Sequence, residues 1–464
     1  MSSWQAQLKA TIDPVVRRSK TVDAIVVGSG VLDQVAPLLT AHFGATKAVL
    51  VADDKGFEAA GQRVDAILAR AGIAVTRHIF PAEPRLKASV ENASAIVEAV
   101  RRTGGLPVAV GSGVINDLVK YAAFQLDQPF FCVATAASMD GYASAGAPLS
   151  DRGFKHTIPC APPRVMLADL DVLSKAPAEM SGWGYGDMAG KIPAGADWIV
   201  ADALGIEAID DVAWPLVQNN LRDWLSAPAA VAAGDPQAMA FLFAGLVVSG
   251  LAMEFHGSSR PASGADHQIA HLWEMEDVAF GGVPVSHGAC VALGTLTVVS
   301  LYDWLLAQDL SGIDARTIVG NRASLAAEEA EIRRRFGKGA IAERSIVEIR
   351  AKYPNDDTLL ARIDHIKAIW PALRARLTEF LVPMPALRSM LRKAGVVTDP
   401  LQVGIGRAHH KNSVLSARFI RQRYTILDLL NDLGLLDSAI DSCFGPDGVW
   451  SPADAPLRQA AGGP

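Results

Sequence analysis

The sequence predicts an α/β protein in which an N-terminal Rossmann-like domain with a parallel sheet is followed by an all-helical domain. Over the first third of the chain, short apolar runs alternate with helical patterns. From about Ala178 onward, long helical patterns follow one another with little strand signal. Strands that alternate with helices are typical of a parallel sheet with right-handed crossovers. The length of 464 residues exceeds one compact core, which favours two domains.

The first domain is predicted to span residues 1–177 and to contain five strands, with a helix after each of the first four. The predicted strands are 23–27, 47–52, 73–79, 106–110 and 129–134. The predicted helices are 31–43, 57–71, 86–103 and 114–125. Ligands of such sheets bind at the carboxyl ends of the strands, so a second domain packed over that edge would form a cleft there.

The second domain is predicted to span residues 178–450. Its expected helices are 215–225, 238–255, 291–306, 316–336, 356–380 and 420–433. The proline-rich stretch 159–177 is interpreted as the linker between the domains. Residues 451–464, rich in Pro, Ala and Gly, are expected to form a mobile tail.

Composition favours a cytoplasmic protein. The net charge of −6 and the pI near 5.9 leave no basic excess, so no nucleic-acid partner is expected. The longest apolar run, Ala238–Met253, is short for a bilayer span, so we expect no stable membrane insertion. The cysteines form no CxxC pair, which makes a disulfide framework or a thiolate zinc site improbable. They are Cys132, Cys160, Cys290 and Cys443.

A glycine pair follows the fourth predicted strand, in the segment Val110–Lys120. Backbone N–H groups at a helix start can hold a pyrophosphate, and glycine lets the backbone approach it. A plain β–α turn is the alternative, because Gly28-Ser-Gly30 shows a similar pair. The candidate cofactor-binding residues here are Gly111, Gly113, Val114, Ile115 and Asp117.

Small polar side chains follow the fifth predicted strand. Thr135 and Ser138 can bond phosphate or ribose, and Asp140 brings a carboxylate to the same region. The alternative is a helix N-cap, since these residue types are favoured there. Asp53, at the end of the second strand, is a candidate for an adenosine ribose, and its alternative is an ordinary turn residue.

The strongest pattern is a set of metal-ligand residue types. His267 and His271 are four residues apart, which places them on one face of a helix. His287 comes later in the chain, at the start of an apolar helix, and Asp187 lies upstream among glycines. Three of the ten histidines fall within the 21 residues from His267 to His287. Two imidazoles and one carboxylate with an open position form a catalytic divalent-metal set.

Three further polar groups lie outside this set. Arg260 lies in the loop before the metal helix, where its fork would suit a phosphate or carboxylate, or where it would belong to a solvated connection. The pair His409-His410 is interpreted as surface, because adjacent helical residues point about 100° apart. The charge run around Glu328 is interpreted as a solvated helix face.

Together these motifs resemble the sn-glycerol-1-phosphate dehydrogenase family. That family belongs to the group of iron-type alcohol dehydrogenases, glycerol dehydrogenase and dehydroquinate synthase. The matching words spread from about Gly111 to Leu430, and the SSRPASG…H…H string is specific to this family. They are GSGVINDLVK, ATAASMDGYAS, GYGDMAGK, GSSRPASGADHQIAHLWEM, VSHG and IRQRYTILDLL. The chain departs from the family pattern at Ser112, Ala145 and Asp266, where Gly, Pro and Glu are more usual.

The resemblance implies that Asp187, His267 and His287 bind one divalent ion, zinc first and nickel or iron as alternatives. It implies that His271 and Asp140 contact the substrate and, with Asp187, act in catalysis. NAD or NADP would contact residues 113–117 and 135–138 and Ser144. The implied reaction interconverts dihydroxyacetone phosphate and sn-glycerol 1-phosphate by hydride transfer, in a homo-oligomer.

Three other functions stay open on the sequence. The first is a dehydrogenase of an unphosphorylated polyol such as glycerol. The second is a lyase similar to dehydroquinate synthase, which uses NAD within one turnover and releases no reduced cofactor. The third is a protein that binds metal or nucleotide without catalysis.

Overall fold

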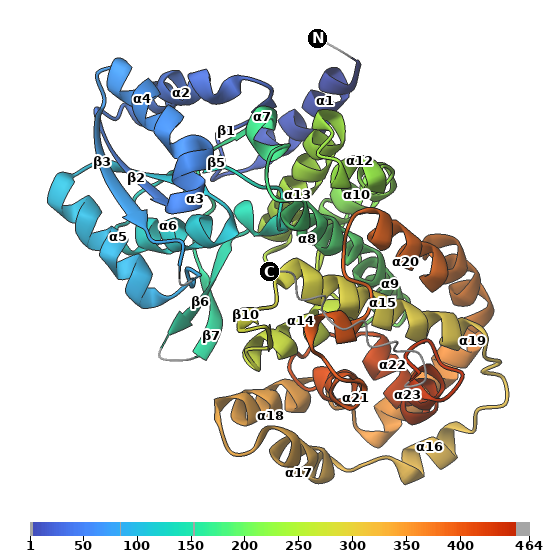
Figure 1. The fold of residues 1–464 in the computed structure, drawn as a ribbon. Coiled ribbons are helices and arrows are strands. Elements are labelled where there is room, and N and C mark those ends of the chain that lie inside the picture. The colour runs from blue at the N-terminus through green and yellow to red at the C-terminus, as the bar shows by residue number, and fades with distance from the viewer. Residues whose placement is uncertain (1–2, 84, 152–153, 452–464) are drawn as a thin grey trace, which may run out of the picture.

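The computed structural model describes residues 3–83, 85–151 and 154–451 (Figure 1). It has an α/β architecture, as predicted. The sheet and its helices, in blue and cyan in Figure 1, lie on one side of the molecule, and helices in green to red form the other side. The first part ends with α7 (Leu170–Leu173), and α8 (Ala178–Ala189) begins the second.

The main sheet of the described residues is parallel and has the strand order β1-β8-β5-β4-β2-β3. Its strands are β1 (Ala24–Gly28), β2 (Lys47–Asp53), β3 (Ala74–Phe80), β4 (Leu106–Gly111), β5 (Phe131–Ala134) and β8 (Val165–Asp169). The first five correspond to the predicted strands. Because side chains alternate along each strand, Val49 and Val51 face one core while Ala48 and Leu50 face the other.

The interpretation of residues 159–177 as a linker was wrong, because this stretch contains β8. That strand is fully buried and pairs with β1 on one side and β5 on the other. A run of only five residues after two prolines gave a weak strand signal. A second departure from the prediction is the antiparallel hairpin of β6 (Gly146–Asp151) and β7 (Phe154–Pro159).

Helices cover both faces of the sheet (Figure 1). The helical segments before α8 are α1 (Ser3–Arg18), η1 (Val31–Gln34), α2 (Val35–Phe43), α3 (Asp54–Gly56), η2 (Phe57–Gly61), α4 (Gln62–Arg70), α5 (Val90–Thr103), α6 (Gly113–Gln125), η3 (Asp140–Tyr142) and α7. The N-terminal α1 was not predicted, and it buries Leu8, Ile12 and Val15.

The remainder is helical apart from one small hairpin, β9 (Ala279–Phe280) with β10 (Val283–Pro284), which corrects the expectation of an all-helical domain. The helices after α8 are α9 (Lys191–Ala203), α10 (Ala213–Gln218), α11 (Leu221–Trp224), α12 (Pro228–Ala232), α13 (Pro236–His256), α14 (Ala265–Met275), α15 (His287–Leu306), α16 (Ala315–Asn321), α17 (Leu325–Phe336), α18 (Ala340–Lys352), α19 (Asp356–Phe380), α20 (Met384–Lys393), η4 (Pro400–Val403), α21 (Arg407–Ala417), α22 (Ile426–Asp432) and α23 (Leu436–Phe444).

Several predicted helices differ from the observed ones. The stretch 215–225 is divided between α10 and α11, and 316–336 between α16 and α17. Residues 420–425 of the last predicted helix are not helical, and α22 begins only at Ile426. The predicted tail, 451–464, lies outside the described residues except for Ser451.

Two helices, α13 and α15, are long and apolar enough to cross a membrane by length and composition. The most apolar windows of these helices are 78% and 83% buried inside the protein, so they act as core helices. One of them also contributes to the site, since α15 starts at His287 and packs closely on α8 and α14.

Glycines allow α8, α14 and α15 to approach at backbone distance. A Cβ at Gly288 would collide with the carbonyl oxygen of Trp183, and one at Gly294 with that of Asp266. A Cβ at Gly186 would lie 2.6 Å from the carbonyl oxygen of Gly288. No larger residue fits these positions without separating the helices. The close packing brings side chains from all three helices to one point.

Candidate functional site

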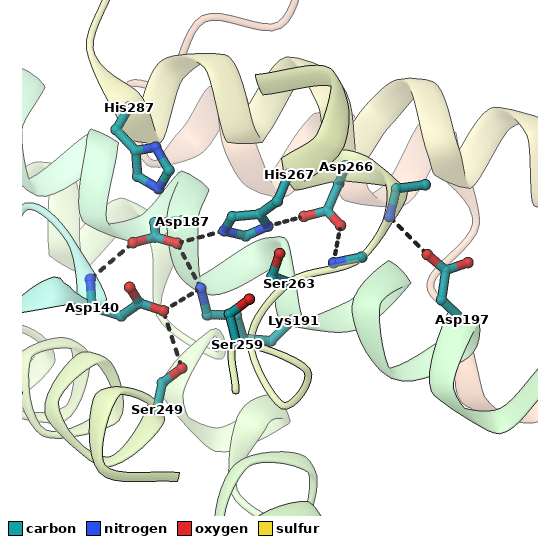
Figure 2. A network of polar contacts seen from close by, with 12 residues as sticks. Asp140, Asp187, Lys191, Asp197, Ser249, Ser259, Ser263, Asp266, His267 and His287 are labelled. Carbon is teal, nitrogen blue, oxygen red and sulfur yellow. Dashed lines mark hydrogen bonds and ion pairs between the residues drawn. The ribbon is translucent and has the colours of Figure 1, made fainter. Parts of the chain in front are cut away.

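Three candidate ligands from three helices meet in the structure. Asp187 lies on α8, His267 on α14, and His287 begins α15. One ligand atom from each lies within 4.8 Å of the other two (Figure 2). Asp187 and His267 are buried and His287 is partly exposed. The set is therefore enclosed on one side and reachable on the other, as a site that must admit substrate requires.

A carboxylate holds each of the two histidine rings. The Nδ1 atom of His267 lies 2.6 Å from Asp266 Oδ2, and Nδ1 of His287 lies 2.7 Å from Glu274 Oε1. A carboxylate favours the tautomer that carries the proton on Nδ1 and accepts a hydrogen bond from it, in which Nε2 keeps the lone pair that can bind a metal. This carboxylate–histidine pairing is typical of metal-binding histidines. The residues present therefore fit a divalent cation.

Charges within the cluster shift the ionisation of its members. Burial alone would lower the pKa of His267, but Asp266 and Asp187 raise it to about 9. Burial works against the charge of Asp187, yet the ammonium of Lys191 and the neighbouring histidines bring its pKa well below the usual range. The carboxylate of Asp187 is therefore ionised and ready to bind a cation.

His271 lies beside the set on the same face of α14. Its ring centroid is 5.9 Å from that of His267 and 5.8 Å from that of His287. Burial lowers the pKa of His271 well below its ordinary value, so its ring is neutral. A second group of donors, His271, Glu274 and His287, also lies within 4.8 Å. It shares His287 with the first group, and Glu274 already holds that ring.

Lys191 is a central residue that the sequence analysis missed. Its Nζ lies 2.6 Å from Asp187 Oδ1 and 2.7 Å from Asp140 Oδ2. Burial opposes its charge, but Asp140 and Asp187 raise the pKa of Lys191 above its ordinary value. The sequence did contain a signal for Lys191, because it follows Asp187 by four residues, a spacing at which opposite charges can pair in a helical segment. Lys191 links the candidate ligand Asp187 to the candidate substrate residue Asp140.

Asp140 reaches the cluster from the sheet side. Its backbone N–H donates to Asp187 Oδ2 at 2.9 Å, and its carboxylate accepts from Ser249 at 3.3 Å. The close approach depends on Gly250 of α13, where a Cβ would lie 2.6 Å from the carbonyl oxygen of Asp140. Figure 2 shows Asp140, Asp187 and Lys191 joined by these contacts.

A second buried lysine holds the loop that follows Asp140. The Nζ of Lys120 donates to the carbonyl oxygens of Gly141 at 2.7 Å, Ser144 at 3.0 Å and Gly146 at 3.0 Å. Asp117, a candidate cofactor residue, is buried 3.9 Å from the same ammonium. Lys120 on α6 and Lys191 on α9 therefore fix one loop from the two parts of the molecule.

The other candidate cofactor residues gather at the carboxyl edge of the sheet. Gly111 ends β4, and its carbonyl oxygen accepts from the N–H of Thr135 at 3.1 Å. Gly113 starts α6, and its N-cap Ser112 makes no side-chain cap bond among the described residues. Ser138 is nearly buried, with 8% of its surface exposed. The first-turn N–H groups of α6 thus lack a side-chain acceptor, which suits an anion such as a pyrophosphate.

Some members of that set also have structural roles. A Cβ at Gly111 would lie 2.7 Å from the side chain of Ile115, which packs in the core below the turn, whereas Val114 stays partly exposed. A Cβ at Gly113 would lie 2.5 Å from Met139, so packing alone also favours glycine there. The hydroxyl of Ser144 donates within its own loop, to Gly141 O at 3.0 Å.

Asp53 occupies the end of β2, as predicted, and it caps α3. Its carboxylate accepts from the N–H of Gly56 at 2.6 Å. A Cβ at Gly56 would lie 3.0 Å from the carbonyl oxygen of Val110, so this turn contacts the end of β4. Asp53 therefore has the role of an ordinary turn residue, and it also lies at the edge of the sheet where a ribose was expected.

Arg260 is held by partners outside the ligand cluster. Its guanidinium is fully buried, donates to the carbonyl oxygens of Asp197 at 2.9 Å and Tyr424 at 3.2 Å, and pairs with Glu207 at 3.1 Å. The assignment of Arg260 to the substrate finds no geometric support here, because these partners turn its charge away from the cluster. The loop of Arg260 is anchored to α9 and to the segment before α22.

Each of two interpretations of polar residues as surface was wrong for one residue. His410 is fully buried, and its Nε2 lies 2.8 Å from the hydroxyl of Thr297, while only His409 is exposed. Glu328 is buried in an ion pair with Arg418. Neither burial could be predicted, because the partners lie far away in the sequence. The four cysteines are buried free thiols, as expected.

Comparison with known proteins agrees with this geometry. The family model described as iron-containing alcohol dehydrogenase matches residues 26–177. A "Glycerol-1-phosphate dehydrogenase [NAD(P)+]" of Halalkalibacterium halodurans is 34% identical over 56% of this chain, and the match spans 65% of that relative. The protein of the same name from Hyperthermus butylicus is 32% identical over 62% of this chain and 81% of the relative.

Among solved structures, an iron-containing alcohol dehydrogenase from Thermococcus thioreducens has a similar fold. The TM-score is 0.56 at 15% sequence identity, over 90% of this chain and 98% of that one. At this identity the likeness concerns the fold alone, and it covers the sheet and the helical part together. From the relative matched over 81% of its length at 32% identity, we conclude that the chain belongs to the glycerol-1-phosphate dehydrogenase family.

Proposed function

We propose that the protein is a metal-dependent, NAD(P)-linked dehydrogenase that interconverts dihydroxyacetone phosphate and sn-glycerol 1-phosphate in the cytoplasm. The observation that carries the proposal is the meeting of Asp187, His267 and His287 within 4.8 Å, beside Asp140 and His271. Membership of the family supports the choice of substrate, since the relatives carry that enzyme name.

Asp187, His267 and His287 would hold the divalent ion. When bound, the ion supplies polarisation of a substrate oxygen, and the nicotinamide cofactor supplies or accepts the hydride. Asp266 and Glu274, which contact Nδ1 of the two rings, would keep both imidazoles oriented for binding the ion. Which divalent ion the protein takes belongs to the same proposal, with zinc first and nickel or iron as alternatives.

Lys191 and Asp140 would position the substrate next to the ligands. Lys191 is fully buried between Asp140 and Asp187, so its charge is held at a fixed place. The neutral ring of His271 would exchange a proton with the substrate oxygen. The buried setting excludes bulk water and strengthens these electrostatic interactions.

The cofactor would lie across the carboxyl edge of the sheet. The start of α6 would face its pyrophosphate, and Thr135 and Ser138 would approach its sugars and phosphates. The loop held by Lys120 carries both Asp140 and Ser144, which connects the cofactor side to the substrate side. We propose a homo-oligomer as the working form.

The test is an absorbance assay at 340 nm on protein reconstituted with zinc. In one direction, NADH or NADPH is offered with dihydroxyacetone phosphate or with dihydroxyacetone. In the reverse direction, NAD or NADP is offered with glycerol. We expect oxidation of the reduced cofactor that depends on dihydroxyacetone phosphate and on the metal. Preference for dihydroxyacetone or glycerol would replace the proposal by an unphosphorylated polyol. A substrate consumed with no net change at 340 nm would favour the lyase alternative.

A further inference from the structure

Asp197 of α9 carries a buried carboxylate that no step of the proposed reaction uses. Asp197 is fully buried, on the helix that begins with Lys191. Its Oδ2 accepts from the N–H of Ala265 at 2.8 Å, and its Oδ1 accepts from the N–H of Ile426 at 2.8 Å and the hydroxyl of Tyr302 at 2.6 Å. One side chain therefore joins α9 to α14, α15 and α22. Two of these helices, α14 and α15, carry candidate ligands.

Two of the donors to this carboxylate are the first residues of helices. Ala265 begins α14 and Ile426 begins α22. The first N–H groups of a helix have no partner within the helix, so they need an acceptor from elsewhere. The N-cap of α14 is Gly264, which has no side chain to supply one. At α22 a capping box satisfies other N–H groups and leaves that of Ile426 to Asp197. One carboxylate thus caps two helix starts, where negative charge is favourable.

The start of α14 lies against α9 at Gly264. A Cβ there would lie 2.6 Å from Asp197 Oδ2, 2.8 Å from Ala194 Cα and 3.0 Å from Asp266 Oδ1. Asp266 in turn accepts from the N–H of Gly264 at 3.0 Å, and a Cβ at Gly190 would lie 2.7 Å from Asp266 Oδ2. The two helices therefore meet at backbone distance, and Asp197 supplies a hydrogen bond between them.

The first turn of α14 connects Asp197 to the ligand cluster. Asp266 and His267 directly follow Ala265, and Asp266 Oδ2 lies 2.6 Å from His267 Nδ1. The other ring nitrogen, Nε2, lies 3.5 Å from Asp187 Oδ1. Figure 2 shows this path from Asp197 through the start of α14 to His267. Ligand distances in metal sites vary by only about 0.2 Å. A shift of the helix start would therefore displace both the ligand ring and the carboxylate that orients it.

We propose that Asp197 is a positioning residue of the metal site, which holds the start of α14 so that His267 meets the other two ligands. The inference rests on the proposed function, because it concerns the ion that Asp187, His267 and His287 would hold. Asp197 is not itself a ligand, and it acts through the N–H of Ala265. Burial raises the pKa of Asp197 to about 6, so at pH 8 the group is ionised and only accepts hydrogen bonds.

The experiment compares Asp197→Asn and Asp197→Ala with the unaltered protein at pH 8. Asparagine offers one oxygen in place of two, so it can accept from only one of the two helix starts. The matched controls are Asp303→Asn and Asp303→Ala. Asp303, on α15, accepts from the N–H of Met384, the first residue of α20, at 2.9 Å. The controls remove the same kind of contact, and α20 carries none of the candidate site residues.

Two quantities are measured without substrate or nicotinamide. The first is the dissociation constant of zinc, from competition with a chelator, and the titration is repeated with nickel and iron(II). The second is the midpoint of urea unfolding of the metal-free protein. A loss of stability alone leaves the dissociation constant unchanged as long as the protein is folded, because the ion binds the native state. Zinc affinity therefore separates a positioning role from a structural one.

We expect Asp197→Ala to weaken zinc binding by about 10-fold and Asp197→Asn by about 3-fold. These effects are at or below the low end for residues that contact a metal ligand, because Asp197 acts through one more residue. All four variants lower the urea midpoint, but the Asp303 variants keep the zinc affinity of the unaltered protein. If Asp197→Ala does not fold, Asp197→Asn decides the result. Equal zinc affinities in the Asp197 and Asp303 variants overturn the inference and leave the proposed function intact.

A failure of the proposed function gives a different result. If the unaltered protein binds zinc but does not turn over dihydroxyacetone phosphate in the assay at 340 nm, the substrate assignment is wrong. The zinc affinities of the variants then still decide the role of Asp197. If the unaltered protein binds none of the three ions, the metal site and the positioning role are both overturned.

Discussion

Two buried imidazoles of the helical part have opposite surroundings. His267 contacts Asp266 at 2.6 Å and Asp187 at 3.5 Å. His410 lies among aromatic rings, with centroids of Phe444 at 4.7 Å and Trp450 at 5.0 Å. Burial is the largest influence on both, yet the carboxylates raise the pKa of His267 to about 9, whereas the pKa of His410 falls to about 3.

The difference shows what separates a candidate metal ligand from a structural histidine. Both rings are removed from water, so burial alone does not distinguish them. The carboxylate next to His267 fixes its Nδ1 and turns Nε2 toward Asp187 and His287. The ring of His410 instead uses Nε2 for the hydroxyl of Thr297 and has no carboxylate contact among the described residues. The partners of each ring therefore decide its role.

The largest expected effect comes from removing the imidazole of His267. In His267→Ala, one of three ligands is missing, so we expect loss of stoichiometric zinc and a decrease of kcat/KM by about 1,000-fold or more. Metal analysis after gel filtration and the assay at 340 nm measure both. His409→Ala, at an exposed histidine paired with Glu276, is the control. A zinc-free His267→Ala enzyme with full activity would refute the scheme.

Removing the other imidazole is expected to affect stability and not metal content. In His410→Ala, a cavity opens among Trp273, Phe444 and Trp450 and the hydroxyl of Thr297 loses its partner. We expect the free energy of unfolding to fall by about 3 kcal/mol. Urea unfolding measures the change. Loss of zinc at unchanged stability would reverse the roles given to the two histidines.

The low pKa of His410 predicts a dependence of stability on pH. The folded pKa of about 3 lies below the ordinary 6.5, so the unfolded chain binds the proton first as the pH falls. The contribution of His410 is complete above pH 6.5 and is lost progressively between pH 6.5 and about 3. At pH 5 the loss is about 2 kcal/mol.

The variant His410→Phe isolates this contribution, since it fills the aromatic pocket and cannot take up a proton. The difference in unfolding free energy between the unaltered protein and this variant should shift by that amount between pH 7.5 and pH 5. A difference that is independent of pH would mean that His410 is not the group responsible.

The carboxylates behind the metal-site rings should have a smaller effect. Asp266→Asn is expected to weaken zinc binding by about 10- to 100-fold, measured by competition with a chelator. Glu274→Gln should cost less, because its side chain is 10% exposed whereas that of Asp266 is fully buried. Glu276→Gln, which breaks a similar 2.7 Å contact with His409, should leave zinc affinity unchanged. If all three variants changed zinc affinity equally, Asp266 and Glu274 would have no special role in holding the metal-site rings.

Much of this arrangement was accessible from the sequence because the signals are local. Short apolar runs and helical periodicity predicted β1 to β5 and helices such as α19, which matches the predicted residues 356–380. The strand β8 was missed because its five residues follow two prolines and carry no alternation. Its place between β1 and β5 is a long-range pairing.

The candidate site likewise has residues that could be predicted from the sequence and residues that could not. The residue types at 187, 267 and 287 predicted a metal set, since only a few side chains bind divalent ions. The sequence did not single out Lys191, although it stands four residues after Asp187. The partners of Arg260 could not be predicted either, because the carbonyl oxygens that bind its guanidinium belong to Asp197 and Tyr424, far away in the chain.

The sequence by itself determined the α/β class, the order of the elements and the donor types from which a metal site is built. The tertiary structure alone decided which donors meet and which polar side chains are buried. The physical reason is that ionisation and ligand geometry depend on burial and on neighbours within a few ångströms. Those neighbours come from α8, α14, α15 and the segment before α22, and glycine contacts between the first three helices set their distances.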